Sequence, residues 1–468
     1  MKYYSTITKF ILIIIFSLIC FSNQAKPRVA IIGAGVAGLS AAKYLTDNLQ
    51  NIEVEVFEAT QTIGGRVGHN SGVSLELGPE AIYGPDTEIY RIIDNLGGKL
   101  EEVHSFRDNM DTNVYIPYNN TYISLGALKS QNAEAKRFME LVSTIFTSEL
   151  NDSENSKLPD VSVFDYLFKI NNFNQTSYLS LAQSFFTSRY SADLEKLNVK
   201  GLNKQIQLNK DYKSYKLVNG FFFNMLKEYY YDQLHPKVMF RLNTRIKEID
   251  YADSNVKIFD KNYESFSFSY VIVTVSTGVL SNENIIFTPS LPQSKLEAIS
   301  KLKIQPMGRL FLKFNEKFWN DSMKMGVLNI GDIASIHVST VDPLMLTATI
   351  AGSSCEKIQQ LHERDPNLVI AQLLNTLEKS FNVTDLKDTL AGFLWYNWTE
   401  NENVKGGYTY PALQEEKARL ELLKPLKNRV YFAGEAVSRE PATFHGAIES
   451  GIDVAKLLIK YLERHSDL

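Results

Sequence analysis

Three glycines near the start of the chain have a spacing that suits the binding of a phosphate group. Gly33, Gly35 and Gly38 form a G-x-G-x-x-G pattern. In this pattern the first glycine permits a tight turn, the second lets the backbone approach a pyrophosphate, and the third allows close packing of a helix on a strand. The helix that follows directs unpaired N–H groups at the anion. The pattern alone is weak, because glycine-rich turns are common.

The elements around these glycines support the interpretation. Residues 29–32 are a short apolar run, typical of a strand buried on both faces. A second predicted strand, 53–58, ends at Glu58, which follows Gly38 by about 20 residues, where an acid binds the ribose hydroxyls of a dinucleotide. The sequence therefore predicts a dinucleotide-binding unit, and these residues leave open whether the ligand is FAD or a nicotinamide.

A second glycine-rich loop follows Glu58. Gly64 and Gly65 precede Arg66, whose planar guanidinium suits phosphate oxygens. We predict that Arg66 contacts the dinucleotide phosphates. The alternative is an exposed arginine after an ordinary turn.

The composition of the chain excludes several classes of protein. The 468 residues are 44% hydrophobic, enough for a large core, and the net charge of −4 provides no basic surface for nucleic acid. We predict no metal site. Of the two cysteines, Cys20 and Cys355, removal of a leader would leave one, so no internal disulfide is expected.

The first 25 residues have the features of a signal peptide. Lys2 and Lys9 precede an apolar run, 10–21, and the small residue Ala25 follows. The run is too short for a comfortable membrane span. We therefore expect cleavage of residues 1–25, a secreted or periplasmic protein and no stable membrane insertion, with an uncleaved anchor as the alternative.

The pattern of apolar residues divides the rest of the chain into alternating blocks. Helical periodicity dominates residues 85–215, and strands are predicted at 307–314 and 344–351. A strand at 270–275 and a closing strand and helix after residue 429 return to the nucleotide-binding side. We expect an α/β fold in which a Rossmann-like dinucleotide-binding domain is interleaved with an α+β substrate-binding domain. The expected pieces are 27–84, 216–290 and 392–465 for the first domain, and 85–215 and 291–391 for the second.

Taken together, these segments resemble a known family, the FAD-dependent amine oxidases. This family includes polyamine oxidases, monoamine oxidases, L-amino acid oxidases and lysine-specific histone demethylases. The resemblance runs nearly end to end after the leader. It rests on the opening glycines with Glu58 and Arg66, on the segment 270–280, and on the C-terminal segments 430–435 and 441–447. It implies that the cofactor is FAD.

The resemblance also implies which residues surround FAD. Glu58 would hold the ribose, Arg66 the phosphates, and the backbone of Ile246 the adenine. The position of the flavin-linking cysteine of monoamine oxidases is Gly407 here, so noncovalent binding is expected. The implied cofactor contacts are Gly33, Gly35, Ala37, Gly38, Glu58, Gly65, Arg66, Gly78, Pro79, Glu80, Ala81, Ile246, Trp398, Gly434, Glu435, Thr443 and Phe444.

The reaction implied by the resemblance is removal of a hydride from the carbon beside an amine nitrogen, with delivery to the flavin. The imine is hydrolysed, and O₂ as acceptor reoxidises the flavin to give H₂O₂. Tyr408 matches one wall of the family's aromatic cage, which suits a developing cation, and Trp398 matches a tryptophan just upstream. Core packing is the alternative for either aromatic residue.

One departure from the family concerns the catalytic lysine, which bonds through a water to the flavin. Arg309 occupies that position, and Lys313 fills the family's other basic position. An arginine does not lose its proton in a protein. The hypothesis is that Arg309 stabilises negative charge on the reduced flavin without acting as a base. The alternative is that Arg309 pairs elsewhere and normal oxidase activity is lost.

Other departures concern the substrate. Tyr83 replaces the tunnel glutamate of plant-type polyamine oxidases, and Thr443 stands opposite Tyr408, as in demethylase-like members. L-amino acid oxidases need a carboxylate-binding arginine near residues 78–79, where this chain has Glu80. Glu80 is a candidate for attracting a cationic substrate, with an exposed loop acid as the alternative.

The sequence therefore predicts a secreted FAD-dependent amine oxidase that acts on a polyamine or related amine, with Arg309, Tyr408 and Thr443 at the reacting centre and Glu80, Tyr83 and Tyr408 near the substrate. One alternative is an FAD-dependent dehydrogenase or desaturase of a non-amine. Another is a flavin-binding protein with little turnover, which the arginine at position 309 keeps open.

Overall fold

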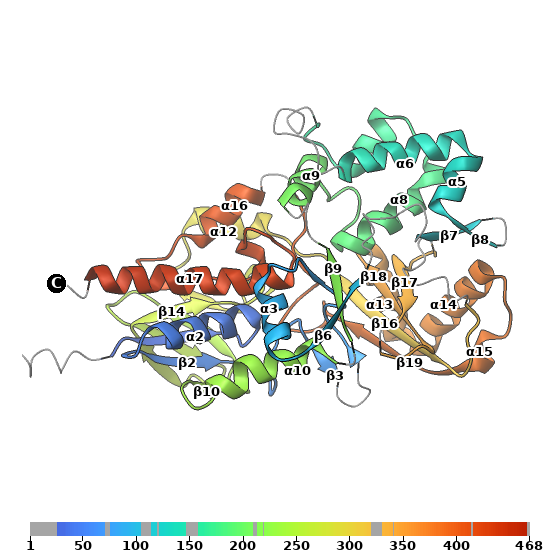
Figure 1. Cartoon of the computed structure of the whole chain (residues 1–468). Coiled ribbons are helices and arrows are strands. Elements are labelled where there is room, and N and C mark those ends of the chain that lie inside the picture. Colours follow the sequence, from blue (N-terminus) through green and yellow to red (C-terminus); the bar gives the residue numbers. More distant parts are fainter. Residues whose placement is uncertain are drawn as a thin grey trace, which may run out of the picture.

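The computed structural model describes residues 26–70, 75–103, 114–118, 121–146, 158–208, 213–218, 220–319, 330–339, 341–412 and 415–465. The predicted leader, residues 1–25, lies outside these ranges. The described chain mixes helices and sheets in the expected α/β fold (Figure 1).

A five-stranded parallel sheet forms the centre of the nucleotide-binding part. Its order is β10-β2-β1-β14-β20, so strands from both ends of the chain lie side by side. Helices α2 and α17 pack against each other along one face (Figure 1). The bounds are β1 (Arg28–Ile32), α2 (Val36–Asn48), β2 (Glu53–Phe57), β10 (Met239–Arg241), β14 (Tyr270–Val273), β20 (Val430–Phe432) and α17 (Phe444–His465).

Strand β1 is buried on both faces, as its apolar sequence predicts. Val29 and Ile31 face the core shared with α2 and α17, whereas Ala30 and Ile32 face a second core. The two helices cross closely, because a Cβ added at Gly451 of α17 would lie 2.1 Å from the carbonyl oxygen of Ala37.

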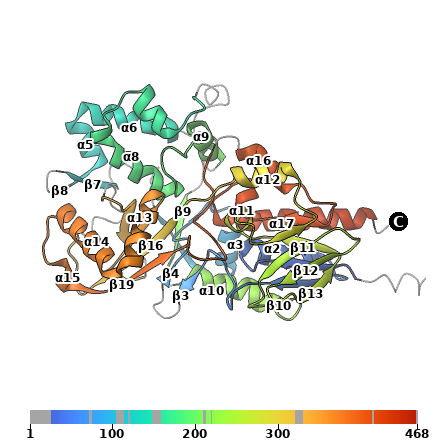
Figure 2. The ribbon, with the colours of Figure 1, turned by 180° about the vertical axis from the view of Figure 1, so that it is seen from behind.

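A second sheet and two helices cover the other face (Figure 2). In the sequence, the dinucleotide-binding pattern resumes in the segment 238–249. The segment forms β10 and β11, which belong to different sheets, because the chain turns between them at Asn243, where φ is +55°. The elements are β11 (Ile246–Asp250), β12 (Val256–Asp260), β13 (Ser265–Phe268), β15 (Ile286–Thr288), α12 (Gln293–Lys301) and α16 (Glu415–Leu423).

The substrate-binding part contains a sheet of order β17-β18-β16-β19, with α13 and α14 packed against it. The expected domain boundary between residues 391 and 392 needs correction, because it divides β19, whose pairing with β16 continues to Asn397. The elements are β16 (Met307–Phe314), β17 (Ser335–Val338), β18 (Met345–Ala351), α13 (Ser353–Arg364), α14 (Pro366–Phe381), α15 (Leu386–Thr389) and β19 (Leu390–Asn397).

The block 85–215 is less uniformly helical than its periodicity predicts. Helices α5, α6, α8 and α9 share an apolar core, whereas α3 packs into the core of the nucleotide-binding part. Strand β6 pairs with β9, and β7 with β8. The elements are α3 (Glu88–Asn95), β6 (Lys99–Val103), β7 (Tyr115–Tyr118), β8 (Thr121–Ser124), α5 (Leu125–Gln131), α6 (Ala133–Phe146), a π-helical turn (Asp165–Ile170), α8 (Gln175–Tyr190), α9 (Val199–Leu208) and β9 (Ser214–Val218).

Shorter elements connect these parts. They are β3 (His69–Asn70), β4 (Leu75–Glu76), β5 (Ile82–Tyr83), α10 (Phe222–Leu226), a π-helical turn (Lys227–Asp232), α11 (Thr277–Ser281) and a 3₁₀ turn (Glu435–Val437). In the described part of the chain, no helix combines the length and apolar character needed to cross a membrane.

Candidate active site

A cavity of about 1080 Å³ lies between the two parts of the molecule. Pockets for small ligands usually measure about 300–1,000 Å³, so this one has room for a large ligand. Its wall includes the loops after β1 and β2, which is the carboxyl edge of the parallel sheet, where ligands bind in folds of this type. Residues from β16, β17 and the end of α8 complete the wall.

The three glycines of the first loop have distinct environments. Gly33 has a φ of +108°, which favours glycine. A Cβ at Gly35 would meet no atom within 4 Å and would enter the cavity, whereas a Cβ at Gly38 would lie 2.0 Å from the carbonyl oxygen of Gly33. At Gly35 the loop therefore exposes backbone without a side chain to the cavity. At Gly38 close packing requires a glycine. Ala37 also lines the cavity.

Glu58 follows β2 and lines the same end of the cavity. Its Oε2 accepts the N–H of Ala34 at 2.9 Å, and its Oε1 accepts the N–H and the hydroxyl of Thr60, both at 2.9 Å. These bonds hold the carboxylate beside the first glycine loop.

The second glycine pair contacts the first glycine loop. Gly64 donates its N–H to the carbonyl oxygen of Ala34 at 2.8 Å. A Cβ at Gly65 would lie 3.3 Å from the Cα of Gly35, and Gly65 has a φ of +58°. The two loops thus form one backbone-lined end of the cavity.

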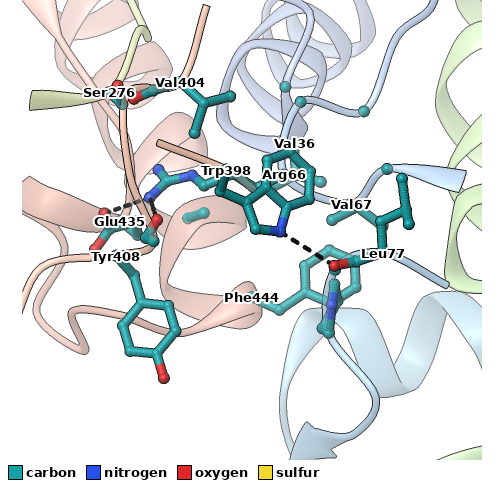
Figure 3. Close-up of a pocket in the computed structure, with 18 of the residues that line it drawn as sticks. Val36, Arg66, Val67, Leu77, Ser276, Trp398, Val404, Tyr408, Glu435 and Phe444 are labelled. Atoms are coloured by element: carbon teal, nitrogen blue, oxygen red, sulfur yellow. Dashed lines mark hydrogen bonds and ion pairs between the residues drawn. The ribbon is translucent and has the colours of Figure 1, made fainter. Parts of the chain in front are cut away.

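Arg66 is held by the C-terminal segment (Figure 3). Its Nη1 lies 2.9 Å from Oε1 of Glu435 and donates to the carbonyl oxygen of Gly407 at 2.8 Å. Glu435 also accepts the hydroxyl of Thr409 at 2.7 Å and the N–H of Ala442 at 3.0 Å. Burial raises the pKa of Glu435, but Arg66, Thr409 and Arg419 together outweigh this effect, and the pKa is lowered. Both residues are predicted from the sequence to lie near the cofactor, but their ion pair is not.

Trp398 lines the cavity and contacts the segment before Gly78 (Figure 3). Its Nε1 donates to the carbonyl oxygen of Leu77 at 3.2 Å. A Cβ at Gly78 would lie 2.1 Å from the carbonyl oxygen of Arg66, so this crossing requires a glycine. The predicted residues Pro79, Ala81, Ile246, Gly434 and Phe444 also line the cavity.

Arg309 lies in β16, is 7% exposed and forms an ion pair with Glu80. Its Nη2 donates to the carbonyl oxygen of Gly78 at 3.0 Å, and its Nε has no hydrogen-bond partner among the described residues. Lys313, on the same strand, pairs with Asp342 instead. Arg309 therefore provides a fixed charge in the cavity wall.

Glu80 has a second partner that the sequence analysis misses. Its Oε1 lies 2.8 Å from Nε2 of His337 in β17. Sheet register explains the meeting, because Arg309 pairs with Thr349 and Thr349 with Ser335, two residues from His337 on the same face. Burial alone would raise the pKa of Glu80, but Arg309 and His337 lower it to about 2. Glu80 is thus an engaged carboxylate and not an exposed loop acid.

Two predicted residues, Tyr408 and Thr443, lie in the wall with their hydroxyls engaged. Tyr408 donates to the carbonyl oxygen of Arg189 at 2.9 Å, and burial raises the pKa of its phenol. Thr443 donates to the carbonyl oxygen of Glu440 at 2.7 Å and accepts the N–H of Gly446 at 3.0 Å, so it also caps α17. Tyr83 lines the cavity nearby.

The residues present fit a dinucleotide. The backbone at Gly35 faces the cavity without a side chain, and Gly434, with a φ of +139°, likewise has no atom within 4 Å of an added Cβ. Side chains at these positions would occupy the space beside the loops, so the glycines leave a cradle for phosphates. The fold and the site define a two-domain dinucleotide-binding protein whose cavity extends from the glycine loops to β16, β17 and the end of α8.

Comparison with known proteins identifies the family. A family model described as flavin containing amine oxidoreductase matches residues 36–459. The chain belongs to this family and is an FAD-dependent amine oxidoreductase, as the resemblance predicts.

Several curated relatives match over most of their length. "Polyamine oxidase 6" of Oryza sativa subsp. japonica is 25% identical, covering 95% of this chain and 92% of that protein. "Polyamine oxidase 1" of Zea mays is 26% identical, covering 94% and 91%. A "Lysine-specific histone demethylase 1B homolog" of Caenorhabditis elegans is 26% identical, covering 95% of this chain and 57% of that protein.

Solved structures show the same fold. A triple mutant of putrescine oxidase superposes with a TM-score of 0.74 at 16% identity and covers 93% of this chain and 99% of that one. Cyclohexylamine oxidase from Brevibacterium oxydans superposes with a TM-score of 0.71 at 19% identity and covers 94% and 100%.

Proposed function

We propose that this protein oxidises a polyamine or a related primary or secondary amine with noncovalently bound FAD. The observation that carries the proposal is a single cavity, in which the backbone cradle of Gly35 and the side chains of Arg309 and Tyr408 share one wall. Similarity to proteins named polyamine oxidases supports the substrate class.

When bound, FAD supplies the redox chemistry, namely acceptance of a hydride from the carbon beside the amine nitrogen and reoxidation by O₂ with formation of H₂O₂. The chain supplies binding and electrostatics. Glu58 and the glycine loops would hold the adenosine and diphosphate end of FAD, and Arg66, which is fixed by Glu435, would contact the phosphates. Tyr408, held by the carbonyl of Arg189, offers an aromatic face to the amine.

Arg309 keeps its charge at every working pH, because a guanidinium does not lose its proton in a protein. Its two Nη atoms are engaged by Glu80 and by the carbonyl of Gly78. We propose that it stabilises negative charge on the ring system and takes no proton from the substrate.

Noncovalent binding is supported by the surroundings of residue 407, which is a glycine in the cavity wall. The described cysteine, Cys355, is fully buried in the core beneath β16 and β18 and does not line the cavity. Precipitation with acid should release all of the flavin into the supernatant.

Export is proposed from the leader-like residues 1–25 alone. The expected product begins after Ala25, and mass spectrometry of the N-terminus of protein recovered outside the cytoplasm tests this. We also propose the discontinuous domain division given above, with β19 moved to the substrate-binding domain. Strand β9, which the boundary between 215 and 216 divides, is kept whole in the nucleotide-binding domain.

The proposed function is tested by anaerobic visible spectroscopy of the purified protein. A yellow flavin that is bleached by spermine, spermidine or a monoamine, and that recovers with H₂O₂ on admission of air, is the expected result. A yellow protein that no amine bleaches would reject amine oxidation. The fixed charge of Arg309 favours a second candidate function, a flavin-binding protein with little turnover. A yellow protein that no amine bleaches would support this second candidate, unless a non-amine substrate bleached the flavin.

A further inference from the structure

One arginine in the cavity wall has no carboxylate beside it. Arg189 is near the end of α8 and lines the cavity close to Tyr83 and Tyr408. Among the residues that the structure describes, no Asp or Glu lies within 4.0 Å of its nitrogens. The other arginines of the wall are paired, Arg66 with Glu435, Arg245 with Glu402 and Arg309 with Glu80.

The groups that face Arg189 are phenols. Its Cζ lies 5.9 Å from the ring centroid of Tyr190, and its carbonyl oxygen holds the hydroxyl of Tyr408. Burial works against its charge, but the hydroxyls of Tyr190, Tyr83 and Tyr408 raise the pKa of Arg189, so it remains a cation. Within the described chain the hydroxyl of Tyr83 makes no hydrogen bond, which leaves it able to donate.

The carboxylates of the cavity wall are all engaged in the described structure. Glu80 is held by Arg309 and His337. The others are Glu58 on backbone N–H groups, Glu101 at 3.2 Å from Lys216, Glu402 on Arg245 and Glu435 on Arg66.

A free polyamine carries a cation at each nitrogen, and a buried cation needs an unengaged acceptor or anion to replace its water. In addition to these paired carboxylates, the described wall holds a guanidinium that has no carboxylate partner. Arginine binds carboxylates through a planar fork, and such charge-assisted bonds are strong where water is excluded.

We propose that Arg189 and the hydroxyl of Tyr83 bind a carboxylate of the substrate, so that the enzyme prefers an amine that carries a carboxylate to a free polyamine. This inference rests on the proposed amine oxidation and narrows its substrate class. The carboxylate site lies on α8 and not at Glu80, the position at which the sequence analysis looked for such a site.

Matched substrate pairs test the proposal. The pairs are 4-aminobutanoate with 1,4-diaminobutane, 6-aminohexanoate with 1,6-diaminohexane, and leucine with 3-methylbutylamine. Anaerobic stopped-flow spectroscopy of the holoenzyme gives the rate constant of flavin reduction divided by Kd for each compound. In at least one pair the carboxylate-bearing compound should be favoured by about tenfold or more, the effect of one charge-assisted hydrogen bond.

Arg189→Gln should lower that value about a hundredfold for the favoured carboxylate compound and change it less than about threefold for its partner. Tyr83→Phe should lower the same value about tenfold for the favoured carboxylate compound. Arg439→Gln removes the same charge from a guanidinium that is 89% exposed. This control should leave the rate constant of flavin reduction divided by Kd unchanged for both compounds. Calorimetry with pentanoate, which has no amine to oxidise, measures the anion site directly, and Arg189→Gln should abolish its binding.

Three outcomes separate the possibilities. If the compound without a carboxylate is favoured in every pair, and Arg189→Gln affects both members equally, the carboxylate site is wrong while amine oxidation stands. If none of these compounds reduces the flavin, and spermine and spermidine do not reduce it either, amine oxidation is wrong. In that case, pentanoate binding that depends on Arg189 supports the anion site, and absence of such binding rejects it.

Discussion

Arg66 and Glu435 lie 369 positions apart in the chain and 2.9 Å apart in the cavity wall. Each belongs to a segment that is predicted to contact the cofactor. Their contact ties the start of the nucleotide-binding part to its end, and it fixes the orientation of the guanidinium that is proposed to contact the phosphates.

Removing either partner of this pair should weaken FAD binding. Arg66→Gln leaves Glu435 buried without its cation, and Glu435→Gln frees the guanidinium, so each variant should retain less FAD and melt at a lower temperature. A double-mutant cycle on the FAD dissociation constant should give a coupling of about 0.5–3 kcal/mol. Arg439→Gln is the control for loss of a charge. Strict additivity of the two substitutions would contradict the functional coupling.

The glycine loop offers a matched pair of substitutions. Gly35→Ala places a methyl group in the cavity without a clash in the protein, and φ at this residue is −70°, which alanine accepts. It should lower FAD affinity at least tenfold and leave the melting temperature of the FAD-free protein unchanged. Gly38→Ala meets the carbonyl of Gly33 at 2.0 Å and should destabilise the protein with or without FAD. Gly392→Ala, at an open position in β19, is the control, and equal behaviour of the first two variants would contradict the cradle.

Arg309→Lys tests the fixed charge. The ammonium is a compact point charge, and it cannot reproduce the planar contacts of Arg309 to Glu80 and the carbonyl of Gly78. We expect both flavin reduction and reoxidation by O₂ to change about tenfold, and reduction to become pH-dependent because a lysine can titrate. Stopped-flow rates across pH measure this. Lys313→Arg, on the same strand but paired with Asp342, is the control, and indistinguishable rates in Arg309→Lys and wild type would remove the role of Arg309 beside the flavin.

Glu76 makes stability depend on pH. Its Oε2 accepts the N–H of Phe222 at 2.9 Å, whereas its Oε1 has no hydrogen-bond partner in the described chain. Burial raises the pKa of Glu76 from 4.5 to about 8. The folded state therefore holds a proton that the unfolded state has lost, and this contribution to stability is full below pH 4.5 and is lost as the pH rises through 8.

Glu76→Gln should remove this dependence. Relative to wild type, the melting temperature of the variant should rise steadily between pH 5 and pH 8, because only the wild-type carboxyl must stay protonated in the folded state. Differential scanning fluorimetry across this range measures the difference. The exposed Glu316→Gln is the control, and a difference that is constant with pH would show that Glu76 does not titrate in this way.

Local patterns predict much of the fold. β16 has the predicted bounds, and β1 begins one residue before its predicted range, because a continuous apolar run is a property of adjacent residues. The meeting of Arg309, Glu80 and His337 could not be predicted in this way, because it depends on the register between three strands. Arg189 was also missed, since helical periodicity does not say which residue of α8 faces a ligand.

The central sheet has a consequence for the synthesis of the protein. Its first two strands leave the ribosome early, but β20, which completes the sheet, and α17, which covers α2, are made last. Until then the part of α2 that packs against α17 is uncovered, and the helical block between the strands has already been made. Contacts between such distant parts form slowly and expose the chain to aggregation. A chain that ends before Val430 should therefore depend on chaperones and fail to acquire FAD, however well its earlier strands are formed.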